Sequence, residues 1–141
     1  MSVKTVMTEN PACCTPSTLL SDVARLMVEN DCGEIPVVED MTTRKLAGVI
    51  TDRDITTRIV ATGRNSAEAK AMDCMTTPCV SVTAESTLET CCEVMETNKI
   101  RRVPVVDGKG GVVGIVALAD VVRTANAATT QSVIKEVSSD V

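Results

Sequence analysis

The spacing of apolar residues predicts two amphipathic helices at corresponding places in the chain. In each, four apolar residues recur at i, i+3, i+4 and i+7, the spacing that brings side chains onto one face of a helix. These residues are Leu20, Val23, Ala24 and Met27 in the first helix and Leu88, Cys91, Cys92 and Met95 in the second. The second stripe therefore repeats the first after 68 residues.

Two short β-rich runs follow each predicted helix. They span 35–38 and 46–50 in the first copy, and 103–106 and 112–116 in the second. A polar loop joins the two runs of each pair, so each pair is expected to form a hairpin of strands. After Thr51 and after Ala117 the pattern becomes helical again. With a short strand at its start, the predicted unit is β-α-β-β-α, given twice.

The repeat extends beyond the apolar pattern to the residues themselves. Met7-Thr8 matches Met75-Thr76, and Pro36-Val37-Val38 matches Pro104-Val105-Val106. We predict an α/β (α+β) fold in which two repeats pack around a pseudo-two-fold axis, with any site at their junction. The expected boundaries are 1–61 for the first repeat, 62–73 for a linker, 74–124 for the second repeat and 125–141 for a C-terminal tail.

Composition narrows the function. The 141 residues are enough for one compact domain. They include 14 basic and 19 acidic residues, a net charge of −5, without a dense basic run, so no nucleic-acid partner is expected. No aromatic residue occurs, so a bound base would have to lie between aliphatic walls. The start of the chain lacks the apolar core of a signal peptide, and the longest apolar stretch, 112–119, is too short to span a membrane. A cytoplasmic location is therefore expected, with no membrane partner.

Seven cysteines without a histidine raise the question of metal or redox chemistry. No C-x-x-C pair occurs, and no metal site is predicted. Five of the cysteines align with apolar residues of the other copy and are interpreted as small core residues. These five are Cys14, Cys32, Cys74, Cys91 and Cys92, whereas Cys13 and Cys79 do not fit this interpretation.

The first candidate for ligand chemistry lies where a strand runs into a helix N-terminus. Free N–H groups and the helix dipole favour anions and hydroxyl-rich groups there, and Thr51 with Asp54 could hold a sugar diol. The same Thr-x-x-Asp pair matches a capping box, which would only complete the first helical turn. The second copy keeps the acid as Asp120 but replaces the threonine with Ala117. This asymmetry favours a ligand role in the first copy.

The second candidate is a change of charge before the Pro-Val-Val strands. Lys99 aligns with Asp31 and Arg102 with Glu34, and Arg101 adds a third positive charge to the second copy. A solvated charged turn would explain this pattern. The alternative is that the three basic residues meet a phosphate, arginine as a bidentate fork and lysine as a point charge.

The doubled unit resembles a pair of CBS domains. The resemblance covers residues 1–124 and rests on Met-Thr at the start of each copy, hydrophobic-Pro-Val-Val in the middle and Gly-h-h-Thr-x-x-Asp before the last helix. It implies a non-catalytic sensor that binds an adenosine-containing ligand in a cleft between the repeats. AMP, ADP, ATP and S-adenosylmethionine are the ligands that such a resemblance implies.

The resemblance also implies roles for individual residues. Asp54 would accept both ribose hydroxyls, Thr51 would support the ribose or phosphate, and Arg101 and Arg102 would reach the phosphates. Lys99 and Arg53 complete the implied polar lining. The implied adenine contacts are Ala12, Cys32, Gly33 and Ile35.

The two clefts are expected to differ. At the second cleft Asp120 would stand beside Ala117, and Asp31 and Glu34 would repel a phosphate. We therefore expect one good site, which prefers a phosphorylated adenosine, and one weaker site at Asp120.

The leading hypothesis is a regulatory module that senses an adenine nucleotide, needs no cofactor, and acts through a homodimer or an unidentified protein partner. An enzyme is not expected, because the chain has no histidine and specifies no pairing of a nucleophile with a base. Two alternatives stay open. One is a structural or partner-binding dimer with vestigial clefts, and the other is an S-adenosylmethionine-type ligand.

Overall fold

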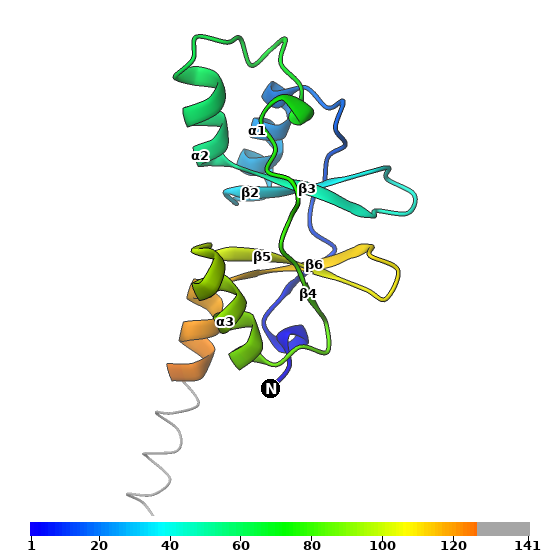
Figure 1. The fold of residues 1–141 in the computed structure, drawn as a ribbon, viewed down its shortest axis with the longest axis vertical. Coiled ribbons are helices and arrows are strands. Elements are labelled where there is room, and N and C mark those ends of the chain that lie inside the picture. Colours follow the sequence, from blue (N-terminus) through cyan, green and yellow to red (C-terminus); the bar gives the residue numbers. More distant parts are fainter. Residues whose placement is uncertain (127–141) are drawn as a thin grey trace, which may run out of the picture.

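The computed structural model describes residues 1–126, so all but the first two residues of the expected tail lie outside the described residues. Two units lie one above the other along the long axis of Figure 1. Their hairpins face each other at the centre, and helices cover the outer side of each hairpin (Figure 1). The predicted mixed fold of two β- and α-containing repeats is confirmed.

The first unit contains two helical segments and one hairpin. Its elements are α1 (Leu20–Glu29), β2 (Glu34–Val38), β3 (Leu46–Thr51) and α2 (Asp52–Ile55), which continues into a π-helical turn, Thr56–Val60. The predicted apolar stripe of α1 faces inward, because Leu20, Val23 and Met27 are buried. The spacing of three to four residues thus produces the expected buried helix face.

The second unit repeats this arrangement. Its elements are β4 (Val82–Thr83), α3 (Leu88–Asn98), β5 (Arg102–Val106) and β6 (Val112–Ala117), followed by helical residues 118–126. Thr87 caps the N-terminus of α3, and its hydroxyl accepts a hydrogen bond from the Thr90 N–H group at 3.1 Å. Two short 3₁₀ turns, Val3–Thr5 and Ala71–Asp73, precede the first strand and the second repeat.

The first strand does not stay with its own repeat. β1 (Thr8–Glu9) pairs antiparallel with β6, where Thr8 lies opposite Ile115, and it completes a four-stranded sheet in the order β1-β6-β5-β4. Val3 is fully buried in the core of the second unit. In the other direction, Thr76 forms a bridge to Val49 of β3. Each unit therefore pairs with the initial segment of the other copy, in an exchange of these segments.

The two hairpins share one register. Glu34 lies opposite Thr51 in the β2–β3 pair, and Arg102 lies opposite Ala117 in the β5–β6 pair. Both pairs become irregular at the same place, between the two valines of Pro-Val-Val. Glu34 and Arg102 therefore occupy the same position in their repeats, each at the start of the Pro strand.

Each unit has its own core, and cysteines contribute to both. Cys14 and Cys74 are buried in the first core and Cys91 in the second, which confirms their interpretation as core residues. Burial raises the pKa of Cys14 to about 12, so this thiol stays protonated. The interpretation is wrong for Cys32, which is exposed because it lies on the loop before β2 rather than on a buried strand.

Cys13 is buried as well, in a small cluster with Val38 and Val112. Its sulfur accepts a hydrogen bond from Arg44 Nη2 at 3.1 Å. Among residues 1–126, no helix combines the length and the apolar character needed to cross a bilayer.

Candidate functional site

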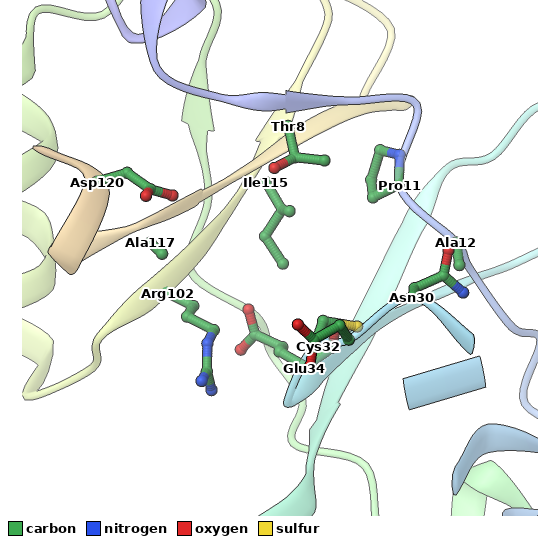
Figure 2. A pocket seen from close by; sticks show the side chains of 11 residues that line it. Thr8, Pro11, Ala12, Asn30, Cys32, Glu34, Arg102, Ile115, Ala117 and Asp120 are labelled. Carbon is green, nitrogen blue, oxygen red and sulfur yellow. The ribbon is translucent and has the colours of Figure 1, made fainter. Parts of the chain in front are cut away.

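A cavity of about 340 Å³ lies between the two units. It is lined by residues of the segments 8–12, 30–34 and 115–120 together with Arg102 (Figure 2). We call it the Asp120 cavity. Because the first and last of these segments come from opposite ends of the chain, the exchange of β1 creates this site.

The exchange sets the walls of the cavity. β1 runs beside β6, so Thr8 comes next to Ile115, and the chain then turns past Pro11 and Ala12 toward the first unit. The side chains of Ala12, Ile115 and Ala117 give the cavity aliphatic surfaces. These surfaces suit a flat heterocycle in a chain that has no aromatic side chain.

Asp120 lies in the first turn of the helical residues 118–126. Its carboxylate is 38% exposed and forms an ion pair with Arg123, with 3.0 Å between Oδ1 and Nη1. In both repeats the first N–H group of this helix donates to a carbonyl before the Pro strand: Leu118 to Arg101 at 2.7 Å, and Asp52 to Gly33 at 2.9 Å. The backbone thus holds the acidic turn next to the loop that lines the cavity.

Glu34 is the buried acid of the cavity. It is only 6% exposed, and its Oε2 atom finds no hydrogen-bond partner among the residues that the structure describes. Burial raises the pKa of its carboxyl group to about 7, against the effect of the neighbouring Arg102 charge. Asp54 raises this pKa further. Burying a carboxylate oxygen without a hydrogen-bond donor destabilises the folded state, so a donor that reached this atom would stabilise it.

Arg102 reaches from the second unit across to the first. A side-chain carbon at Gly33 would come within 3.0 Å of Arg102 Nη1 and within 3.0 Å of Asp52 Oδ2. The guanidinium group and the Asp52 carboxylate therefore lie close against the Gly33 backbone. Arg102 lines the Asp120 cavity and two neighbouring depressions, so it stands where several surfaces meet.

Thr51 and Asp54 form the capping box that the sequence indicated. The Thr51 N–H group donates to Asp54 Oδ2 at 2.9 Å, and the Asp54 N–H group donates to Thr51 Oγ1 at 3.1 Å. The Asp54 side chain is 15% exposed, and Arg58 approaches its Oδ1 atom at 3.9 Å. The capping interpretation is therefore confirmed. A ligand role for the same pair stays a prediction.

The structure divides the predicted site residues into groups. Ala12 and Cys32 line the Asp120 cavity, which Thr51 and Asp54 do not line. Ala12 lies there because it follows β1, and β1 pairs with β6 of the second unit. Ile35 is fully buried in the first core, so it is not available to contact a base.

The remaining basic residues lie away from this cavity. Arg101 is exposed and lines a neighbouring depression with Arg102 and Arg123. Lys99 directly follows α3 and adopts the left-handed conformation, with φ of 54°. Arg53 is exposed on the first turn of α2. The cluster of Thr51, Asp54, Arg101 and Arg102 in one cavity was expected, but only Arg102 joins the cavity described here.

Two kinds of lining residue escaped the sequence analysis. Thr8 and Ile115 line the cavity only because β1 pairs with β6, and no local pattern signals that pairing. The sequence predicts that Glu34 repels a phosphate, and the structure adds that it is buried and lines the cavity. The reversal of charge between positions 34 and 102 was the signal that could have placed it.

Within residues 1–126 no group of three or more cysteine, aspartate or glutamate side chains is arranged to hold a metal ion. Burial raises the pKa of the Cys79 thiol to about 12, with a contribution from Glu34, so this thiol stays protonated.

Comparison with known proteins agrees with this architecture. The family model described as "CBS domain" matches residues 3–61 and 71–126. The CBS domain-containing protein YhcV of Bacillus subtilis is 40% identical over 119 residues, which are 84% of this chain and 81% of YhcV. The chain belongs to the CBS-domain family, as a pair of CBS domains in tandem.

Solved structures include two similar proteins. The structure of Hypoxic Response Protein I with two coordinated zinc ions has a TM-score of 0.78 and 31% identity, and the match covers 87% of this chain and 98% of that one. Hypoxic response protein 1 is a protein of Mycobacterium tuberculosis. CBSX2 of Arabidopsis thaliana, in complex with AMP, has a TM-score of 0.75 and 30% identity over 91% of this chain and 98% of that one.

Proposed function

We propose that this chain is a non-catalytic regulatory module that binds an adenosine-containing ligand in the Asp120 cavity. The observation that carries the proposal is the cavity of about 340 Å³ between the repeats, with a carboxylate at one side and aliphatic walls. The likeness to CBSX2, which was solved with AMP, supports an adenosine compound as the ligand.

The chemistry of the lining fits the parts of a nucleoside. The Asp120 carboxylate is accessible, and Arg123 pairs with Oδ1, so Oδ2 can accept hydrogen bonds from the vicinal hydroxyl groups of a ribose. Ala12, Ile115 and Ala117 can hold the base by apolar contact. The Asp120 cavity is therefore the first candidate site, and the surface around Thr51 and Asp54 is the second.

Calorimetric titration with AMP tests the proposal. We expect Asp120→Ala to weaken AMP binding about tenfold or more, because hydrogen bonds to a charged group are lost. Asp22→Ala is the matched control: Asp22 pairs with Arg25 at i,i+3 in the first turn of α1, as Asp120 pairs with Arg123, but Asp22 does not line the cavity. Unchanged AMP affinity in Asp120→Ala contradicts the site.

Asp54→Ala in the same titrations reports on the cleft that the sequence favoured. ADP, ATP and S-adenosylmethionine complete the series and decide which adenosine compound binds best. If none of them binds, the alternative of a structural or partner-binding dimer replaces nucleotide sensing.

We also propose that the module acts as a homodimer. Val28 on α1, Val60 after α2 and Val122 in the helical residues 118–126 are exposed by 81%, 63% and 47%. Apolar side chains on the outer helices favour association with another surface. Sedimentation equilibrium measures the mass in solution, and a monomer at micromolar concentration contradicts this part of the proposal.

A further inference from the structure

The Glu34 carboxyl group lies at the cavity without a complete set of hydrogen bonds. Glu34 is only 6% exposed, and its Oε2 atom has no hydrogen-bond partner within the described residues. It lines the Asp120 cavity from the side of β2, and Figure 2 shows it extending into the space between the repeats. A buried acceptor of this kind is stabilised only when a donor reaches it.

Within residues 1–126, the surrounding protein groups do not supply that donor. Arg102 is near enough for its charge to lower the pKa of Glu34, but it does not complete the hydrogen bonding of Oε2. The other close ionisable groups are Asp54, whose charge raises the same pKa, and Cys79. Oε2 is itself shielded from solvent, so an O–H or N–H group of a ligand, both of which a nucleoside carries, satisfies it only when the carboxyl group turns toward the cavity. A fully ionised phosphate cannot, because it offers acceptors only.

The charges of the cavity also oppose phosphate. Asp31, Glu34 and Asp120 line it, and Arg102 is the basic residue of its lining. Arg123 balances Asp120 through the ion pair at 3.0 Å, which leaves Asp31 and Glu34 against Arg102. One phosphate can pair with Arg102, whereas each further phosphate brings negative charge toward a carboxylate in a partly water-excluded space.

From these contacts we propose that Glu34 is a specificity-determining residue of the Asp120 cavity, which selects an adenosine group with at most one phosphate and rejects a triphosphate. The inference rests on the proposed function and specifies the ligand of the same site. It narrows the expected adenosine ligands, which included ADP and ATP, to those with at most one phosphate.

The test compares adenosine, AMP and ATP in calorimetric titrations at pH 8, where Glu34 is ionised. The wild type is expected to bind adenosine and AMP more tightly than ATP. Glu34→Gln keeps the size of the side chain and removes its charge, so it should raise ATP affinity relative to adenosine by about tenfold. Glu39→Gln is the matched control, since Glu39 is an exposed acid just after β2 and outside the cavity lining.

The outcomes separate this inference from the proposed function. Tighter binding of ATP than of adenosine by the wild type overturns the inference without any variant, and so does an ATP-to-adenosine ratio that Glu34→Gln leaves unchanged. In either case, loss of AMP binding in Asp120→Ala leaves the proposed function standing. If Asp120→Ala binds all three probes normally, the ligand lies elsewhere and the inference fails. If no probe binds the wild type, the proposed function fails with it.

Discussion

Replacement of Glu34 by glutamine should change how the stability of the fold depends on pH. The carboxyl group is 6% exposed, and burial raises its pKa from 4.5 to about 7. In the unfolded chain the group returns to its ordinary value. The native state therefore holds a proton on Glu34 over a pH range in which the unfolded state has released it.

The sign of the pH dependence follows from this difference in pKa between the native and unfolded states. A carboxyl group with a raised pKa contributes stability that is fully present below pH 4.5 and is lost as the pH rises through about 7. At about 1.36 kcal/mol per pH unit, the loss approaches about 3 kcal/mol above neutral pH. For a domain whose total stability is about 5–15 kcal/mol, such a loss is large enough to measure.

Urea unfolding followed by far-UV circular dichroism suits a chain without tryptophan or tyrosine. The free energy of unfolding is measured between pH 4.5 and 8.5 for the wild type, Glu34→Gln and the surface control Glu39→Gln. We expect the wild type to lose about 3 kcal/mol relative to Glu34→Gln across this range, while Glu39→Gln follows the wild type. Parallel curves for the wild type and Glu34→Gln would refute the reasoning, as would a wild type that gains stability relative to the variant.

Two further predictions concern the fold. Gly48→Ala should destabilise the chain by about 1–3 kcal/mol, and by more than Gly114→Ala at the matching position. The new Cβ at position 48 would lie 2.7 Å from the Thr76 backbone oxygen, which cannot easily move. At position 114 the nearest atom, at 2.6 Å, belongs to the flexible Met7 side chain. Equal losses in urea unfolding would contradict this argument. Thr51→Ala removes one bond of the capping box and should cost about 1 kcal/mol in the same assay, and no loss would show that the cap is dispensable.

The parts of the fold that depend on local spacing could be predicted from the sequence. The buried face of α1 follows from apolar residues three and four apart, and the Pro strands follow from short β-rich runs. The capping box at Thr51 and Asp54 was likewise visible, because its two partners are three residues apart. In each case the interacting residues are close in the chain, so the pattern carries the interaction.

The composition of the site could not be predicted in the same way. Thr8 lies beside Ile115 through a pairing between the start and the end of the two repeats, and Ala12 follows β1 to the Asp120 side of the junction. The resemblance implied that Ala12 contacts the base at the site of Thr51 and Asp54, whereas in the structure Ala12 lines the Asp120 cavity. An exchange of strands leaves the sequence pattern of each copy unchanged, so the pattern does not reveal which copy the strand joins.

The opposite charges of Glu34 and Arg102 at matching positions of the two copies also act on each other in the folded chain. Glu34 and Arg102 occupy the same position in their repeats, and a pseudo-two-fold arrangement brings such equivalent positions toward each other when they lie near its axis. The charge of Arg102 lowers the pKa of Glu34, so the two side chains lie close enough to interact. Two arginines there would repel, and two glutamates would both be buried without compensation. The opposite charges at 34 and 102 therefore serve the junction itself, and the positive charge of Arg102 is already partly balanced before any phosphate arrives.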